Sequence, residues 1–310
     1  MNIAIIGRTK ALFDTALVLY KKGYKIKLVI TAKAATEYKK TSNDFENLAL
    51  KIGAEYIYSP HINKEGIVQK LKQYNLDIGI SVNYPNVISQ EVIDQFRLGI
   101  LNAHAGDLPK YRGNACLAWA ILNAEDCIGL CIHKMIGGEL DSGDIIAREY
   151  FNLTIDTKIT KVHNWTTERV PVLFGKALAL LQENPNYVLK VQSKDPFKSL
   201  RCYPRKPEDG KINWNVNAIE ILRLINACNK PYYGAFSDFE GEEVKIWDAE
   251  LIEKDEIYLA VPGQVSRVNK EDETLDVICG EGKLKIKLIE FANVEQPPTN
   301  LIKSIRKRFT

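Results

Sequence analysis

The sequence predicts an α/β fold, with a mostly parallel sheet covered by helices on both faces, followed by a small β domain. Runs rich in Ile and Val at residues 2–6, 25–31, 54–58 and 76–82 alternate with amphipathic stretches at residues 11–22, 43–51 and 66–74. Such alternation is typical of right-handed β-α-β crossovers, which build parallel sheets. Short strand-like runs joined by glycines and charged turns near the end of the chain predict the second part.

Length and composition indicate an ordinary globular protein. The chain has 310 residues, 45% of them hydrophobic, which is enough for two domains. We expect a catalytic domain over residues 1–192, a proline-punctuated linker over residues 193–215 and a second domain over residues 216–310. The six cysteines form no CxxC pair and predict reduced thiols in a cytoplasmic protein. No signal-peptide pattern or membrane-length apolar run is visible, so we expect no membrane association.

The first turn of the predicted sheet lacks a dinucleotide signature. Gly7-Arg-Thr-Lys10 holds one glycine, so the fold is Rossmann-like without the GxGxxG pattern. Ligands of such sheets bind at the carboxyl ends of the strands, where Arg8 and Lys10 lie. These two residues are candidates for holding an anionic part of the substrate, although two solvated basic residues would give the same pattern.

The remaining elements complete this plan. Residues 83–88 are a predicted turn at the ligand edge, and Ser89 caps a predicted helix over residues 89–96. An amphipathic helix over residues 160–183 closes the first domain. In the second domain we expect a helix at residues 218–228 and strands at residues 244–247, 265–268, 275–278 and 284–289. A small β-barrel or sandwich is the natural interpretation.

The segment from Gly99 to Asp144 holds the predicted chemistry. Residues 99–104 are a predicted strand whose alternation places Asn102 and His104 on one face. A helix over 115–124 and a strand over 128–135 follow, and then an acidic turn that contains Asp141. An amide can donate to a developing oxyanion, an imidazole can accept a proton, and a carboxylate can orient the imidazole. These three roles suit acyl transfer to an amine, although a structural histidine and an ordinary Asx turn would leave the same trace.

Other catalytic classes fit less well. His61, His133 and His163 share no ligand-like spacing with one another or with the cysteines, so we predict no metal site. The nucleophile elbow of serine hydrolases is also missing.

Three ordered motifs resemble a known family. They are Asn102-Ala-His104, Gly106-Asp-Leu-Pro-Lys-Tyr-Arg-Gly113 and Leu140-Asp-Ser-Gly-Asp-Ile145, and they are similar to the signature of 10-formyltetrahydrofolate-dependent formyltransferases. Residues 203–214 and 231–236 resemble the linker and second-domain segments of the longer members, and residues 261–265 the entry to their OB-like C-terminal domain. The short purine-pathway members carry Gly-Pro where this chain has Gly143-Asp144, and they are a poor match.

The resemblance implies a set of site residues. Asn102, His104 and Asp141 would be catalytic, and 10-formyltetrahydrofolate would be the cosubstrate. The folate would lie along Asn86, Val87 and Ile88 and along the loop that contains Gly137 and Gly138. Asp144 belongs to the same predicted cofactor region. Asn114 is also a predicted cofactor contact. It departs from the pattern of amino-sugar formyltransferases, which often have Arg at this position.

Two classes of formyl-group acceptor are known in this family, and the sequence favours one of them. The tRNA enzymes carry a long basic loop rich in Pro and Gly after the second strand, whereas residues 32–47 contain neither residue and balance their charges. A net charge of +3 also indicates no strongly basic face, which makes nucleic acid unlikely as a partner. We therefore expect a dTDP-linked amino sugar as the acceptor, for O-antigen or another surface polysaccharide, with Arg8 and Lys10 on its diphosphate. Methionyl-tRNA is the alternative, a non-catalytic folate- or nucleotide-binding regulator is a third hypothesis, and a homodimer is expected.

Overall fold

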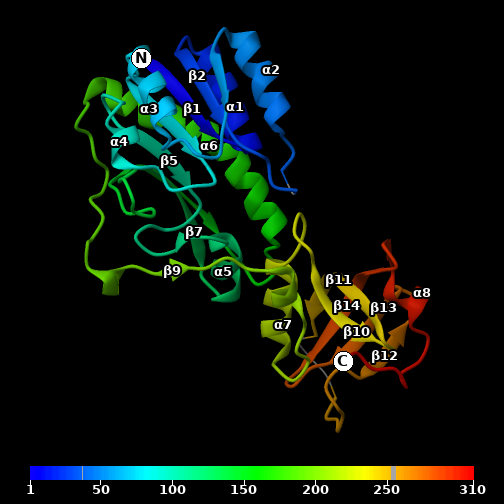
Figure 1. Cartoon of the computed structure of the whole chain (residues 1–310). Helices are drawn as coiled ribbons and strands as arrows, with labels where there is room; N and C mark the ends of the chain where they lie inside the picture. The colour runs from blue at the N-terminus through cyan, green and yellow to red at the C-terminus, as the bar shows by residue number, and fades with distance from the viewer. Residues whose placement is uncertain (37, 253–255) are drawn as a thin grey trace. The chain divides into compact units, whose positions relative to one another are not determined.

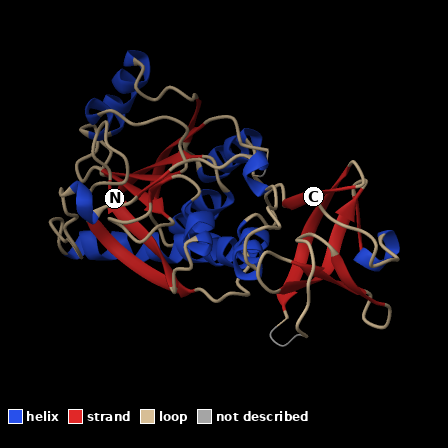
Figure 2. Cartoon of the chain, turned by 90° about the horizontal axis from the view of Figure 1, so that it is seen from below, coloured by secondary structure: helices blue, strands red, loops and turns tan. Residues whose placement is uncertain are grey.

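The computed structural model describes residues 1–36, 38–252 and 256–310. The chain divides into two compact units. Unit 1 comprises Met1–Cys116, Ile128–Phe151 and His163–Tyr203, and unit 2 comprises Leu117–Cys127, Asn152–Val162 and Pro204–Thr310. Each unit is built around a sheet of its own (Figures 1 and 2).

Unit 1 is organised by a seven-stranded sheet in the order β3-β2-β1-β4-β5-β7-β8. Its strands are β1 (Asn2–Gly7), β2 (Lys25–Thr31), β3 (Glu55–Tyr58), β4 (Ile78–Val82), β5 (Ile100–His104), β7 (Cys127–Lys134) and β8 (Ile145–Asn152). The strands from β3 to β5 pair in parallel, and β7 pairs with β5 antiparallel. The strand order reverses between β1 and β4, and in such sheets ligands bind beyond the carboxyl ends of the strands at this point.

Helices cover both faces of this sheet. They are α1 (Lys10–Lys21), α2 (Ser42–Ile52), α3 (Glu65–Leu71), α4 (Gln90–Ile93) and α6 (Ile159–Glu183), with a 3₁₀ turn η1 (Lys72–Tyr74) after α3. The short helix α5 (Cys116–Leu122) belongs to unit 2 apart from its first residue. The side chain of Thr9 caps α1 by accepting from the Leu12 amide at 3.3 Å. Thr41 and Asp44 form a capping box that starts α2.

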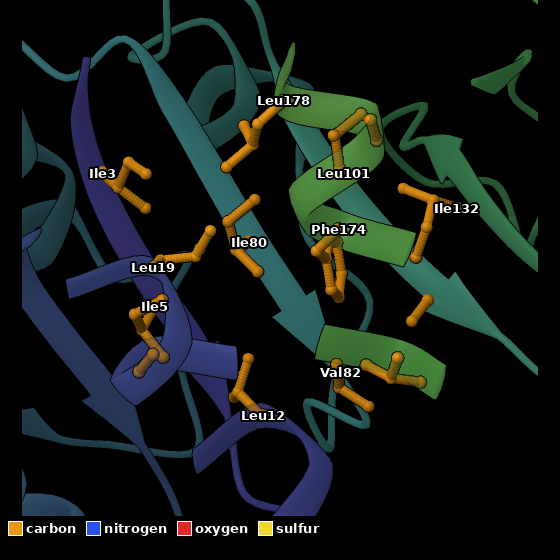
Figure 3. Packing of buried hydrophobic residues seen from close by; sticks show 14 of the residues in the cluster. Ile3, Ile5, Leu12, Leu19, Ile80, Val82, Leu101, Ile132, Phe174 and Leu178 are labelled. Carbon is orange, nitrogen blue, oxygen red and sulfur yellow. The ribbon is translucent and has the colours of Figure 1, made fainter. Parts of the chain in front are cut away.

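Alternation along β1 divides the core of unit 1 into two layers. Ile3 and Ile5 pack into a cluster with α1, α2 and α6, while Ala4 and Ile6 face a cluster built with α3 and α4. Figure 3 shows the first cluster, in which the side chain of Phe174 lies between its own helix, α6, and the strands of the sheet. Truncating a buried aromatic side chain to alanine costs about 3–5 kcal/mol, so this layer fixes α6 on the sheet.

Unit 2 contains an antiparallel sheet in the order β10-β11-β14-β13-β12, with β15 paired to β14. Its elements are α7 (Ala218–Ala227), β10 (Ala235–Phe239), β11 (Glu242–Leu251), β12 (Val265–Asn269), β13 (Thr274–Ile278), β14 (Lys283–Phe291), β15 (Val294–Gln296) and α8 (Pro298–Leu301). The apolar face of α7 packs with the sheet and with Trp214 and Phe309, whose ring centroids lie 5.4 Å apart.

The predicted fold class is confirmed: a mostly parallel α/β sheet is followed by a small β domain. The structure adds elements that the patterns did not predict, such as β10 and the length of β8. Two short strands also pair in parallel, β6 (Arg112–Gly113) and β9 (Arg201–Cys202), and 3₁₀ turns form at η2 (Pro196–Lys198) and η3 (Pro207–Gly210). No helix in the described part of the chain is long and apolar enough to cross a membrane.

Candidate active site

The strand β5 places two of the predicted catalytic residues side by side on one face of the sheet. Asn102 and His104 stand two positions apart, so their side chains point the same way. The antiparallel partner β7 places His133 directly opposite Asn102. Residues directly opposite in an antiparallel pair share a face of the sheet, so three polar side chains gather at one point.

Asp141 completes this cluster from the loop that follows β7. Its Oδ2 lies 3.4 Å from Nδ1 of His104, and its Oδ1 lies 3.4 Å from Nε2 of His133. Asn102 donates from Nδ2 toward Oδ1 of Asp141 at 3.5 Å. The structure therefore brings Asn102, His104 and Asp141 together, as their predicted roles require.

The carboxylate of Asp141 is buried, with 8% of its side chain exposed, and yet it stays ionised. Burial alone would raise its pKa. The nearby His104, the hydrogen bond from His133 and the backbone amide of Gly113, which donates to Oδ2 at 3.0 Å, outweigh burial and hold the pKa of Asp141 well below its ordinary value. The site thus contains a permanent negative charge at neutral pH.

Hydrogen bonds also fix the backbone around Asp141. This residue has a left-handed conformation with φ of 50°, which Asp tolerates better than most residues. Gln192 donates from Nε2 to the carbonyl oxygens of Asp141 and Gly143 at 2.9 and 2.6 Å. An ideal Cβ at Gly143 would come within 1.9 Å of the Lys134 carbonyl oxygen, so only glycine fits this turn.

The second nitrogen of His104 faces an acceptor. Nε2 lies 2.6 Å from the carbonyl oxygen of Tyr111, which also accepts from the Cys116 thiol at 3.0 Å. A carbonyl oxygen only accepts, so Nε2 of His104 carries a hydrogen. Burial raises the pKa of Cys116, which keeps this thiol protonated. An ideal Cβ at Gly106 would lie 2.5 Å from Nε2 of His104, so the absence of a side chain there makes room for the imidazole.

His133 is the site residue that sequence reasoning missed. Its side chain is almost fully buried, its Nδ1 donates to the Lys134 carbonyl oxygen at 2.9 Å, and its Nε2 lies 3.3 Å from Nδ2 of Asn102. A carbonyl oxygen only accepts, so Nδ1 carries a hydrogen, and Nε2 faces both the Asn102 amide and Oδ1 of Asp141. His133 has no ligand-like spacing along the chain, whereas pairing of the predicted strands 99–104 and 128–135 places it opposite Asn102.

The loop after β4 contains three of the predicted folate residues, Asn86, Val87 and Ile88. Their side chains have different surroundings. Asn86 donates to the Pro60 carbonyl oxygen at 2.6 Å and lines a cavity of about 460 Å³ together with His61, Asn63 and Lys64. The side chain of Val87 is 51% exposed. Ile88 is buried in the core, so only its backbone faces the neighbouring loop, where its carbonyl oxygen accepts from the Gly138 amide at 3.3 Å.

The other predicted folate residues lie on both sides of the acidic turn. The Gly137 amide donates to Oε1 of Gln90 at 2.9 Å, and an ideal Cβ at Gly137 would lie 2.2 Å from the Gln90 backbone nitrogen. Asp144 accepts from the Gln192 amide through Oδ1 at 3.2 Å. Asn114 is exposed, and its amide donates to the Cys202 carbonyl oxygen at 3.1 Å.

The two predicted anion-binding residues are engaged within the chain. Arg8 donates from Nε to the Asn83 carbonyl oxygen at 3.0 Å and from Nη1 to the Lys33 carbonyl oxygen at 2.8 Å. Lys10 forms an ion pair with Asp14 one helical turn later. Arg8 therefore ties the loop after β1 to the loops after β2 and β4. Among the described residues, no group of three His, Cys, Asp or Glu side chains is placed to hold a metal ion.

Two family models match this chain. The one described as formyl transferase matches residues 1–178, and the one described as formyl transferase, C-terminal domain, matches residues 205–304. The chain belongs to the formyltransferase family. The predictions of this family and of an enzyme that transfers formyl groups are confirmed.

Relatives of this formyltransferase align with most of its length. A protein of Sulfurihydrogenibium sp. is 32% identical over 231 residues, which are 74% of this chain and 72% of the relative. A protein of Agathobacter rectalis is 26% identical over 289 residues, which are 92% of this chain and 90% of the relative. Both are named methionyl-tRNA formyltransferase.

A solved structure shares the fold. The N-formyltransferase from Helicobacter canadensis, in complex with folinic acid and dTDP-3-aminofucose, has a TM-score of 0.68 at 19% identity. The match covers 92% of this chain and 97% of that chain. At this level of identity the likeness shows the fold alone.

The prediction of a dTDP-linked amino sugar as the acceptor is wrong. Relatives that align with most of the chain carry the name methionyl-tRNA formyltransferase. The prediction depended on a small net charge and on a loop after the second strand that lacks Pro, Gly and excess basic residues. A net charge is an average and one loop is a local feature, so neither describes every surface of the protein. The reason for expecting a diphosphate on Arg8 and Lys10 disappears with it.

Proposed function

We propose that this formyltransferase formylates the amino group of methionyl-tRNA, with 10-formyltetrahydrofolate as the donor. The observation that carries the proposal is the name of the relatives that align with 74% and 92% of the chain. The cluster of Asn102, His104 and Asp141 supports it, because a complete set of donor, imidazole and carboxylate suits formyl transfer to an amine. The same intact cluster argues against a non-catalytic regulator.

The loops at the ligand edge fit a folate. The cavity of about 460 Å³ beside Asn86 lies within the range of small-molecule sites. The Gly138 amide donates to the Ile88 carbonyl oxygen at this edge, and an ideal Cβ at Gly138 would meet no atom within 4 Å. Asn86 and the backbone from Val87 to Ile88 would hold the cosubstrate, which supplies the formyl carbon.

Asn102 is placed to stabilise negative charge on the formyl oxygen. Its Nδ2 lies 3.3 Å from Nε2 of His133 and 3.5 Å from Oδ1 of Asp141. Well-formed N–H···O bonds measure about 2.7–3.2 Å, so both contacts orient the amide without engaging its hydrogens strongly. The amide can therefore turn one hydrogen to an oxyanion at small cost.

His104 carries the positive charge of the site when it is doubly protonated. Its two nitrogens face a carbonyl oxygen at 2.6 Å and a carboxylate at 3.4 Å, and both of these groups are acceptors. The amine nitrogen gains the formyl carbon and loses a proton, and the donor nitrogen loses that carbon and gains a proton. His104 relays this proton, and Asp141 keeps the imidazole oriented during the exchange.

Formyl incorporation tests the proposal. The full chain is incubated with 10-formyltetrahydrofolate and charged initiator tRNA, and both N-formylmethionine and released tetrahydrofolate are measured. Uncharged tRNA and the His104→Ala variant are the controls, and dTDP-linked amino sugars are offered in parallel. We expect formylation of the charged tRNA only. Turnover of an amino sugar without turnover of the tRNA would overturn the proposal. A homodimer stays a prediction, which light scattering coupled to size-exclusion chromatography tests.

A further inference from the structure

A segment of unit 1, residues 192–203, presents an exposed aromatic side chain on an ordered turn. We call this segment the strap. Phe197 is 97% exposed. Its backbone amide donates to Oδ1 of Asp195 at 3.0 Å, the Lys198 amide donates to the Asp195 carbonyl oxygen at 3.1 Å, and Ser199 donates from Oγ to the Pro196 carbonyl oxygen at 2.9 Å. These bonds hold the 3₁₀ turn η2 in a fixed shape, and the ring is displayed to solvent on it.

Both ends of the strap are fastened to the residues that hold the catalytic carboxylate. At one end, Gln192 donates to the carbonyl oxygens of Asp141 and Gly143. At the other end, Cys202 in β9 pairs with Gly113 in β6, and the amide of Gly113 donates to Oδ2 of Asp141. Figure 1 shows the strap in yellow-green, running along the margin of unit 1 to β9.

The strap is basic as well as aromatic. Residues 192–203 contain three Lys or Arg and one acidic residue, Asp195, which is used as the cap of η2. Lys194, Lys198 and Arg201 are exposed. The guanidinium of Arg201 lies 5.4 Å from the ring centroid of Tyr203, which is 66% exposed. Exposed aromatic rings among cations are typical of surfaces that bind single-stranded nucleic acid, because bases stack on the rings and phosphates contact the cations.

We propose that the strap binds the single-stranded 3′ end of the charged tRNA. Phe197 and Tyr203 provide faces on which its bases stack, and Lys194, Lys198 and Arg201 contact its phosphates. The inference rests on the proposed function, since the amino group to be formylated is carried by the 3′-terminal nucleotide. A single strand is favoured over a duplex because paired bases keep their faces stacked on each other. A protein partner is disfavoured because lysine is depleted in the buried centres of protein interfaces.

Binding of a short RNA separates this inference from the proposed function. A fluorescently labelled single-stranded hexanucleotide ending in CCA is titrated with the full chain, and the anisotropy gives Kd. We expect Phe197→Ala to weaken binding by about 5- to 100-fold, as loss of one stacked base does. Phe197→Trp should retain binding. Tyr20→Ala, at a half-exposed ring on α1, is the matched control and should bind like the parent.

Salt dependence tests the phosphate contacts. The double variant Lys194→Ala/Lys198→Ala should lower the slope of log Kd against log salt by about 1.4, because each contact with a single strand contributes about 0.7. With charged tRNA as substrate, Phe197→Ala should raise KM and leave the single-turnover rate at saturating tRNA within about twofold of the parent, since the ring touches no reacting atom.

The outcomes are distinct. Parent-like hexanucleotide binding by Phe197→Ala, or an equal loss in Tyr20→Ala, would overturn the inference even if methionyl-tRNA is formylated. If the parent binds the hexanucleotide through Phe197 but never formylates tRNA, the proposed function fails and the strap remains an RNA site. A parent dimer that Phe197→Ala converts to a monomer would assign the strap to a second copy of the chain and would also overturn the inference.

Discussion

Replacing Asp141 by Asn tests the electrostatic core of the site while preserving its shape. The carboxylate receives hydrogen bonds on both of its oxygens, from Gly113 at Oδ2 and from Asn102 at Oδ1. An amide accepts on its oxygen only. Whichever way the new amide turned, its NH₂ group would face another donor, so the variant loses a contact as well as the charge.

The expected loss of turnover follows from the distance between the His104 imidazole and the Asp141 carboxylate. Nδ1 of His104 lies 3.4 Å from Oδ2 of Asp141. Two unit charges at this separation attract by about 5 kcal/mol at an effective dielectric constant of about 20. The cost of burying the two charges cancels part of this attraction. Hydrogen bonds to charged groups contribute about 1.5–3 kcal/mol net. We therefore expect the turnover of Asp141→Asn to fall by about 10²-fold.

The assay is the single-turnover rate of formyl transfer, measured between pH 5 and 9 with saturating substrates. The parent keeps an ionised Asp141 throughout this range, because the pKa of this carboxyl lies below its ordinary value. The variant has lost the anion that stabilises imidazolium His104, so its pH–rate profile should differ from that of the parent. An unchanged profile with turnover within a few-fold of the parent would refute the reasoning and leave Asp141 as a turn residue.

Further variants address the neighbours of this carboxylate. Asn102→Ala should lower turnover by about 10²-fold or more, as loss of an oxyanion donor does, with little change in folate affinity by fluorescence titration. His133→Ala should lower turnover by about 10-fold through a misplaced Asn102, and His133→Gln should recover part of it; parent-like rates in His133→Ala would exclude a positioning role. Gly106→Ala should abolish activity, because the new Cβ would lie 2.3 Å from the Tyr111 carbonyl oxygen; an active, normally folded variant would contradict this. In urea unfolding, the parent should exceed Asp141→Asn in stability by a constant amount above about pH 5, and the gap should shrink as pH falls through about 4, since a lowered pKa stabilises only the ionised form.

The fold was predictable wherever local pattern and topology agree. The alternation of apolar strands and amphipathic helices in residues 2–82 predicts parallel pairing, and β2 was predicted with its observed limits, Lys25–Thr31. The strand over residues 128–135 was also predicted, but its antiparallel direction was not, because apolar periodicity contains no information on direction. β8 continues to Asn152 through the polar residues Arg148 and Glu149, whose partners Asp107 and Arg169 are distant in sequence.

The residues of the candidate site were likewise predictable where a local motif marks them and not where a tertiary contact places them. Asn102, His104 and Asp141 could be identified from motif order, whereas His133 depends on strand register and therefore on a tertiary contact. The acceptor was mispredicted because a net charge of +3 averages over 310 residues and does not show that residues 192–203 alone carry three basic side chains and one acidic one.

The contacts of the strap with the residues around Asp141 determine when, during synthesis, the proposed site can be completed. The three proposed catalytic side chains lie between residues 102 and 141, yet the hydrogen bond from Gln192 to the Asp141 carbonyl oxygen spans 51 positions, and β9 ends at Cys202. Synthesis at about 5–20 residues per second leaves roughly 3–12 s between the emergence of Asp141 and that of Cys202. During this interval the hydrogen bond from Gln192 to Asp141 and the pairing of β9 with β6 cannot yet form. The proposed site therefore receives these supports only after residues 192 and 202 have been synthesised.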